Sequence, residues 1–203
     1  MEKHVIINIG RQFGSGGKQV AEQLGRQLGI EVFDTELISK AAEKSGISAS
    51  LFTSSDEKKD FLKIGTMFGG NRYYSNEALN SNSLFKIQSE TIREIALKGN
   101  AIFVGRASDY VLRDFDCCLN IFITAPKKAR IRRIGERLSL DAKEAWALIQ
   151  KKDKSRKQFY DFVTMGDNWG VAGNYDLCID SSLLGIEKTA ELIIQFGRET
   201  GLL

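Results

Sequence analysis

Short apolar runs of strand length alternate along the chain with segments of helical periodicity. After the first run, Val20, Leu24 and Leu28 recur every four residues, which predicts an amphipathic helix that Gly29 can end. Strands that alternate with helices favour a parallel sheet with helices on both faces, an open three-layer α/β fold. The predicted strands are 5–9, 31–33, 101–104, 119–123 and 177–179, and the later helices are 37–42, 83–98, 127–138, 142–164 and 185–198.

One stretch of the chain does not follow this alternation. Residues 45–82 contain Ser-rich and Gly/Asn-rich patches around one amphipathic segment, and they carry no motif. We therefore expect a single domain over residues 1–203 in which 45–82 is an insertion. Pro126, the only proline, lies where the helix over 127–138 would begin, and that position suits its missing N–H donor.

The composition of the 203 residues is that of a globular protein. Hydrophobic residues make up 42% and charged residues 27%, which excludes collagen-like, disordered and membrane-spanning classes. No apolar run approaches the roughly 20 residues of a membrane span, and the N-terminus lacks the pattern of a signal peptide. Three cysteines without paired metal spacing indicate a reducing compartment. We expect a cytoplasmic protein.

The positive charge is concentrated in one segment. Residues 125–160 hold 12 Lys or Arg against 4 Asp or Glu, a local net charge of +8, whereas the rest of the chain has a net charge of −5. Such a segment indicates an anionic ligand, either a nucleotide phosphate or a nucleic acid. A solvated helix face is the alternative reading of the same residues.

A glycine-rich turn directly follows the first predicted strand and opens the first predicted helix. Its sequence is Gly10-Arg11-Gln12-Phe13-Gly14-Ser15-Gly16-Gly17-Lys18. Glycines allow backbone N–H groups to approach an anion closely, and the helix N-terminus adds partial positive charge. Lys18 has the position from which a P-loop lysine reaches the β- and γ-phosphates. Gln12 and Gln19 depart from the usual P-loop string, which has Gly at the first of these positions and Ser or Thr at the second.

This turn resembles the phosphate loop of the cytidylate kinase-like family, relatives of the P-loop nucleoside monophosphate kinases. The resemblance continues, in the family's order and over nearly the whole chain, through 32–38, 104–112, 129–134 and 175–182. It implies a P-loop NTPase three-layer sandwich with a central parallel sheet of about five strands, a helical lid over 127–164 and an acceptor-side insertion over 45–82. It also implies ATP-dependent phosphoryl transfer to a nucleoside monophosphate, with CMP or dCMP as the leading acceptor.

The resemblance assigns residues to two phosphate-binding regions. By this resemblance, the acceptor would contact Asp34, Arg106, Asp153 and Arg156. Arg106 directly follows the third predicted strand, and Asp153 and Arg156 share a helix face. Other interpretations stay open. Asp34 could be a helix N-cap, Arg106 could form an ion pair with Asp109, and Asp153 and Arg156 could form an intrahelical salt bridge. The residues expected to bind the ATP phosphates are Gly14, Ser15, Gly16, Gly17, Lys18 and Gln19.

Four arginines populate the helix over 127–138 but cannot all face one ligand. At 3.6 residues per turn, Arg130, Arg133 and Arg137 share a face, whereas Arg132 points away and is expected to be solvated. With Lys18, Arg130 and Arg133 are the predicted catalytic residues. The aromatic residues Phe159, Tyr160 and Phe162 are read as packing rather than as a base-stacking platform, and no chemistry is assigned to His4.

Two departures from the family pattern bear on metal binding and turnover. Gln19 replaces the hydroxyl that normally helps to hold Mg²⁺, and no acid stands at the end of the strand over 101–104, where Ala107 also replaces the acid that follows the family's arginine. Ser15 or Asp109 are possible substitutes through water. We expect Mg²⁺ to arrive with ATP, and the metal ligands stay unassigned.

The partners expected are ATP and a small phosphorylated acceptor, with no membrane partner. Two other functions stay open for the same residues: a kinase for another small acceptor, and a nucleotide-binding regulatory protein with little turnover. A nucleic-acid binder that uses 127–157 is the least favoured alternative. The sequence does not indicate an oligomeric state.

Overall fold

The computed structural model describes residues 4–34, 76–166 and 168–203. The helix expected over 37–42 and the expected insertion up to residue 75 lie outside these ranges. The helix expected to begin at residue 83 begins earlier, because α5 spans Asn76–Lys98.

Five strands form one sheet in the order β2-β3-β1-β4-β5, and every neighbouring pair is parallel. This confirms the predicted sheet of about five parallel strands. Parallel strands bring their carboxyl ends to one edge, where ligands of open α/β sheets bind. The loop that follows the central strand β1 therefore lies between those that follow β3 and β4. The strands are β1 (Ile6–Arg11), β2 (Val32–Phe33), β3 (Ala101–Val104), β4 (Cys118–Thr124) and β5 (Leu177–Asp180).

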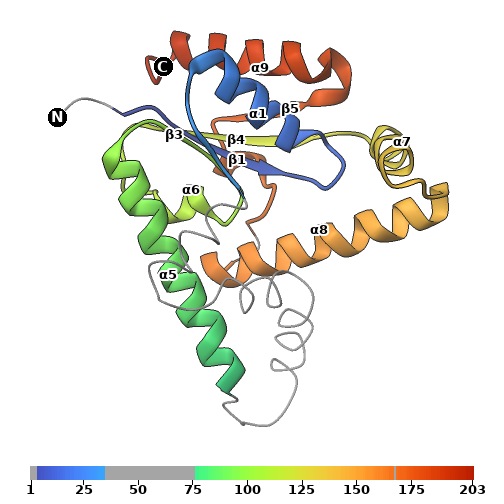
Figure 1. Ribbon diagram of the computed structural model, residues 1–203, viewed down its shortest axis with the longest axis horizontal. Helices are drawn as coiled ribbons and strands as arrows, with labels where there is room; N and C mark the ends of the chain where they lie inside the picture. The colour runs from blue at the N-terminus through green and yellow to red at the C-terminus, as the bar shows by residue number, and fades with distance from the viewer. Residues whose placement is uncertain (1–3, 35–75, 167) are drawn as a thin grey trace.

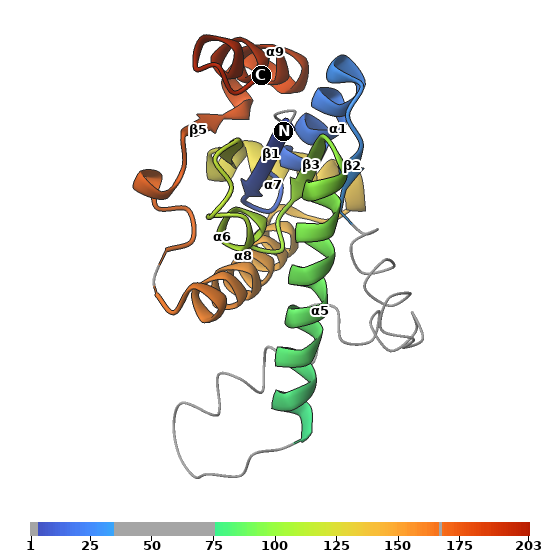
Figure 2. The same cartoon turned by 90° about the vertical axis from the view of Figure 1, so that its left-hand side faces the viewer.

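Helices cover both faces of the sheet, as Figures 1 and 2 show. Helices α1 (Gly17–Leu28) and α9 (Ser181–Glu199) lie together on one face. Helices α5, α6 (Ser108–Val111) and α8 (Ala142–Thr164) lie on the other, and α7 (Lys127–Leu138) leads from β4 into α8. No helix in the described ranges is both long and apolar enough to span a bilayer.

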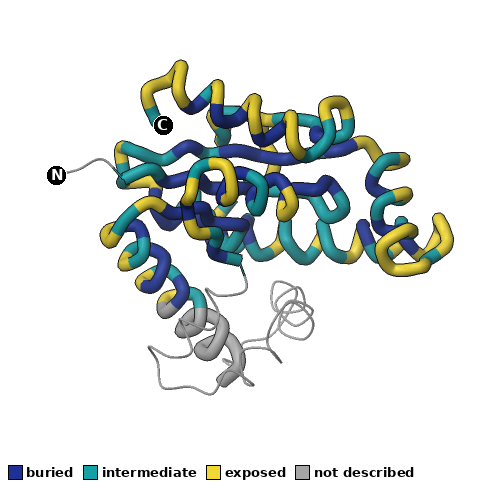
Figure 3. Tube along the Cα trace, turned by 45° about the horizontal axis from the view of Figure 1, so that its top comes forward, coloured by how far each residue is buried: buried dark blue, intermediate teal, exposed yellow. Residues whose placement is uncertain are grey.

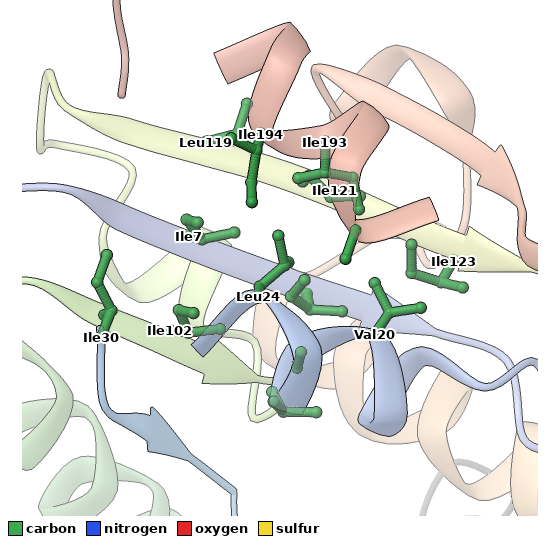
Figure 4. Close-up of a cluster of buried hydrophobic side chains, with 14 residues drawn as sticks. Ile7, Val20, Leu24, Ile30, Ile102, Leu119, Ile121, Ile123, Ile193 and Ile194 are labelled. Carbon is green, nitrogen blue, oxygen red and sulfur yellow. The ribbon is translucent and has the colours of Figure 1, made fainter. Parts of the chain in front are cut away.

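The core fills the space on both sides of the strands. On one face, Ile7 and Ile9 of β1 pack with Val20 and Leu24 of α1 and Ile193 of α9, and all five are buried. Figure 4 labels Ile7, Val20, Leu24 and Ile193 in this cluster, and Figure 3 shows that the strands are mostly buried. A second cluster on the opposite face is formed by residues of β1, β3, α5 and the α6 region, among them Ile6, Phe103, Ile92 and Leu112. Burial on both faces explains why these strands appear in the sequence as continuous apolar runs.

The last helix begins before the predicted start at Gly185. Asp180 caps it by accepting a hydrogen bond from the Ser182 N–H at 2.7 Å, and one helical turn precedes Gly185. Gly185 itself has a non-helical backbone, with φ 77°, so it kinks α9 rather than starting it. The turn before this kink lies beside the loop that follows β1.

Candidate functional site

The loop between β1 and α1 has a backbone that requires glycine at two positions. Gly14 and Gly16 have φ of 80° and 83°, in the left-handed region. Space is also short, because a Cβ on Gly16 would lie 2.6 Å from Ile186 Cδ1. No side chain caps the described N-terminus of α1, whose N-cap is Gly16. Its first N–H groups and its partial positive charge are therefore placed to bind an anion.

Hydrogen bonds to the Ser15 carbonyl fix the shape of this loop. Arg133 Nη1 donates to that carbonyl at 2.7 Å, and the Ser181 hydroxyl donates to it as well. Arg133 also donates to Ser181 Oγ at 3.0 Å, so α7 and α9 hold the loop jointly. The Ser15 hydroxyl donates to the Gln12 carbonyl at 2.8 Å, and Ser15 is fully buried.

A buried ion pair attaches the tip of the loop to α7 and α8. The Asp153 carboxylate accepts a hydrogen bond from the Phe13 N–H at 2.7 Å and pairs with Arg130 Nη2 at 2.6 Å. Arg130 is only 5% exposed. The guanidinium carbons of Arg137 and Arg156 each lie 5.4 Å from the centroid of the Phe13 ring. We call the Phe13–Asp153–Arg130 arrangement the loop brace.

The loop borders a first cavity of about 540 Å³, which we call the loop cavity. Its wall contains Lys18, Arg133 and Arg137, together with the apolar side chain of Ile186. Arg11 and Arg156 also line it, and cations around a row of backbone N–H groups suit a ligand with several negative charges.

A second cavity of about 230 Å³ lies between the end of β3, α6 and α8. We call it the aromatic cavity. Asp109 is in its wall, and Asp109 Oδ2 accepts a hydrogen bond of 2.6 Å from the Tyr160 hydroxyl. Burial raises the pKa of the Asp109 carboxyl, and the hydrogen bond from Tyr160 offsets this only in part. Its aromatic lining residues are Phe159, Tyr160, Trp169 and Tyr175.

Charged residues form the wall that the two cavities share. Arg11, Asp34 and Arg156 line both of them. Asp34 Oδ1 lies 3.5 Å from Arg11 Nη2, and its Oδ2 lies 3.2 Å from Lys18 Nζ. Arg156 Nη1 donates to the Arg11 carbonyl at 3.2 Å. Negative groups bound in the two cavities would therefore meet at a wall that carries two guanidinium groups.

Arg106 lines the aromatic cavity from a strained turn after β3. Gly105, Arg106 and Ala107 have φ of 74°, 61° and 52°, three left-handed residues in succession. The left-handed region costs roughly 1–2 kcal/mol for a residue with a Cβ, and such conformations cluster at functional sites. Gly105 also makes room for Arg11, whose Nη1 would lie 1.6 Å from a Cβ at that position.

The structure brings most of the predicted site residues together, in two groups. Gly14, Gly16, Gly17, Lys18, Gln19 and Arg133 line the loop cavity, and Asp34, Arg106 and Arg156 line the aromatic cavity. Ser15, Arg130 and Asp153 line neither cavity. Arg130, expected to contact phosphate, and Asp153, expected to contact the acceptor, pair with each other in the loop brace.

Several lining residues were not predicted from the sequence. Arg11 stands within the glycine-rich turn, but only its neighbours were assigned a role. Asp109 was considered as an ion-pair partner of Arg106 or an indirect metal contact, and Tyr160 was read as packing. Trp169 and Tyr175 belong to the connection between α8 and β5, which has no periodicity that would have singled them out.

The described residues contain no cluster of three or more His, Cys, Asp or Glu side chains that could hold a metal ion by itself. Asp34 is the acidic residue on the shared wall. A cation there would have one carboxylate and would need its remaining ligands from a bound molecule or from water.

Comparison with known sequences places these features in a family context. The sequence profile of the cytidylate kinase-like family matches residues 6–183. A cytidylate kinase of Methanopyrus kandleri is 25% identical over 198 residues, which cover 93% of this chain and 91% of that protein. A cytidylate kinase of Staphylothermus marinus is 30% identical over 113 residues, but these cover only 55% of this chain and 61% of that protein.

Solved structures share the fold. A crystal structure of a protein from Eubacterium ventriosum has a TM-score of 0.72 at 27% identity and covers 95% of this chain and 97% of that one. The shikimate kinase of Acinetobacter baumannii, solved in complex with shikimate, has a TM-score of 0.53 at 15% identity and covers 100% and 97% of the two chains. The three-layer architecture is therefore that of the P-loop kinases.

Proposed function

The chain belongs to the cytidylate kinase-like family, and from this premise we propose that it transfers the γ-phosphoryl group of ATP to a nucleoside monophosphate, with CMP or dCMP as the leading acceptor. The observation that carries the proposal is the pair of cavities that meet at a charged wall. In-line transfer between two nucleotides mainly requires that both phosphate groups are positioned there and that their charge is neutralised.

In the proposed complex, ATP occupies the loop cavity with its phosphates on the N-terminus of α1. Lys18 and Arg133 contact the transferring group, and Arg11 and Arg156 neutralise charge where the two substrates meet. The acceptor occupies the aromatic cavity, with its phosphate on Arg106. Arg130 and Asp153 act as positioning residues, because they hold Phe13 and through it the loop.

Magnesium fits this arrangement as a cofactor that is delivered by ATP. Asp34 is the residue placed to hold it, since Ser15 Oγ is directed to the Gln12 carbonyl and Gln19 has no hydroxyl. The bound ion would supply charge neutralisation on the phosphates. In the nucleotide-free state, Lys18 and Arg11 are cations that balance Asp34.

The nucleotide-free protein should therefore bind Mg²⁺ only weakly, because one carboxylate is a poor site for an ion that loses its water reluctantly. Titration calorimetry with MgCl₂ should detect no site tighter than the millimolar range, whereas the same titration with a non-hydrolysable ATP analogue present should detect binding. A micromolar site in the free protein would show that other residues hold the metal.

A nucleotide-binding regulator with little turnover is the second candidate, and Gln19 and the buried Ser15 hydroxyl favour it. An ATP-consumption screen against all nucleoside monophosphates, with Mg²⁺ and with Mn²⁺, separates the two functions. Transfer to one acceptor supports the kinase. Tight ATP binding without transfer to any of them supports the regulator.

Arg106→Ala should chiefly raise the KM for the acceptor, by about tenfold or more, since a charged hydrogen bond contributes roughly 1.5–3 kcal/mol. The KM for ATP should stay nearly constant, because the lost contact belongs to the other substrate. Arg106→Lys should restore only part of the affinity, because an ammonium group cannot form a bidentate contact with phosphate.

Steady-state kinetics with both substrates varied test this, and Arg113→Ala is the matched control. Arg113 is exposed on the same connection and stacks on Tyr110 at 4.3 Å, away from both cavities. A loss of ATP affinity in Arg106→Ala with unchanged acceptor saturation would place Arg106 on the ATP side.

A further inference from the structure

We propose that the buried hydroxyl of Ser181 keeps the glycine-rich loop in the backbone conformation that binds the donor's phosphates, by fixing the direction of the Ser15–Gly16 peptide group. The inference rests on the proposed function, because it takes the loop cavity as the site of the ATP phosphates. Ser181 lines neither cavity, and it acts through the loop rather than by contact with a substrate. It is therefore a positioning residue.

The Ser15 carbonyl is the group on which the inference depends. Ser15 and Ser181 are both fully buried, and the Ser181 hydroxyl donates to this carbonyl. Arg133 Nη1 donates to the same carbonyl at 2.7 Å and to Ser181 Oγ at 3.0 Å. One buried carbonyl of the loop is thus held by a donor from α9 and a donor from α7, and the two donors are hydrogen-bonded to each other.

The direction of this carbonyl also determines the direction of the Gly16 N–H. None of the described peptide bonds is cis, so the N–H of the Ser15–Gly16 peptide group points the opposite way from its carbonyl. With the carbonyl directed to Ser181, the N–H is directed away from Ser181, and Gly16 is part of the wall of the loop cavity. An N–H group attracts a phosphate at such a site, whereas a carbonyl oxygen would repel it.

Glycine makes a reversal of this peptide group easy unless something opposes it. The reversal changes ψ of Ser15 and φ of Gly16 and little else in the chain. Gly16 has a φ of 83°, and glycine adopts negative φ about as readily, so its own conformation does not oppose the change. After the reversal, the carbonyl would take the place of the N–H. The donors from Ser181 and Arg133 therefore select the conformation that binds phosphate.

Ser181 is fixed independently of the loop. It directly follows β5, which is hydrogen-bonded to β4 in the sheet. Asp180 caps α9 by accepting a hydrogen bond from the Ser182 N–H at 2.7 Å. The helix is kinked at Gly185, whose carbonyl accepts a hydrogen bond from the Thr189 hydroxyl. The sheet and the kinked start of α9 thus place the Ser181 hydroxyl, and the loop is held against it.

The test measures the binding of tripolyphosphate, ATP and CMP to the full chain and to Ser181→Ala by titration calorimetry. The Kd for tripolyphosphate should rise by about three- to tenfold, as expected for the loss of one hydrogen bond between uncharged groups. The Kd for ATP should rise by a similar factor, because its phosphates bind the same loop. The Kd for CMP should stay constant, because the acceptor occupies the aromatic cavity.

Two further variants separate positioning of the loop from general support of the fold. Ser181→Cys keeps nearly the same shape but is a weaker donor, so its Kd values for tripolyphosphate and ATP should lie between those of the wild type and Ser181→Ala. Ser182→Ala changes the next residue of the same turn, which lines neither cavity and keeps its N–H bond to Asp180, and it should leave all three Kd values unchanged. In Ser181→Ala the Ser15 carbonyl keeps Arg133 as a donor, and thermal unfolding should show an intact fold.

The outcomes distinguish failure of the inference from failure of the proposed function. Wild-type affinity for tripolyphosphate and ATP in Ser181→Ala, or an equal loss of affinity for all three ligands, would overturn the inference and leave the proposed function standing. If the wild-type protein binds ATP but transfers phosphate to no nucleoside monophosphate, the proposed function fails, while a loss confined to tripolyphosphate and ATP still supports the role of Ser181. If the wild-type protein binds neither tripolyphosphate nor ATP, both are wrong.

Discussion

Lys18→Ala should weaken ATP binding or turnover by about 10- to 100-fold, because a charged hydrogen bond to phosphate contributes roughly 1.5–3 kcal/mol. Stability should change little. The Lys18 side chain is 55% exposed, and its contact with Asp34 is a surface ion pair, which contributes about 0–1 kcal/mol at most. Asp34 keeps Arg11 as a second cationic neighbour in the variant.

Calorimetry with ATP, together with transfer kinetics, measures the expected loss, and thermal unfolding checks that the fold is intact. Lys98→Ala is the matched control, since Lys98 is an exposed lysine at the C-terminal end of α5 and lines neither cavity. Wild-type ATP affinity together with wild-type turnover in Lys18→Ala would remove the loop cavity from consideration as the ATP site.

Asp153→Ala should lower the free energy of unfolding by about 3 kcal/mol, because it leaves the buried Arg130 guanidinium without its carboxylate. The Phe13 N–H would also lose its acceptor. A domain of this size loses roughly 2–4 °C in Tm for each kcal/mol, so Tm should fall by about 6–12 °C. The KM for ATP should rise too, since the loop is no longer held at Phe13.

Chemical denaturation and thermal melts measure this effect, and Asp114→Ala provides the contrast. Asp114 is 66% exposed and lies 3.6 Å from Arg93, so its removal should cost at most about 1 kcal/mol. The double variant Arg130→Met, Asp153→Leu should recover much of the stability, because no charge is left buried and unpaired. Equal stability of Asp153→Ala and Asp114→Ala would contradict the loop brace.

The sheet and most helices follow from local patterns in the sequence. Strands buried on both faces are mostly apolar, so runs such as Ile6-Ile7 in β1 and Ala101–Val104 in β3 can be recognised without any knowledge of their partners. The glycine-rich turn is visible for a related reason, since its backbone conformation excludes most other residues.

The loop brace could not be predicted from local patterns in the sequence. Spacing alone pairs Asp153 with Arg156, three residues along the same helix, whereas the residue that binds Asp153 is Arg130, 23 residues earlier on α7. Asp109 and Tyr160 are separated by 51 residues and come from two different helices, α6 and α8. Contacts of this kind depend on how helices pack, and single-sequence periodicity does not specify which side chains meet across a helix pair.

The left-handed turn after β3 also determines which side chains its positions can accept. Ala107 is 3% exposed and packs in an apolar cluster with Tyr160 and Val163, so its surroundings favour a hydrophobic residue. Its φ of 52° favours the opposite, because Gly, Asn and Asp enter this region readily while β-branched residues do so at high cost. Conformation and environment thus impose contrary preferences on one position, and alanine satisfies both only in part. Scales that rank substitutions by hydrophobicity alone will misjudge the mutational tolerance of this turn.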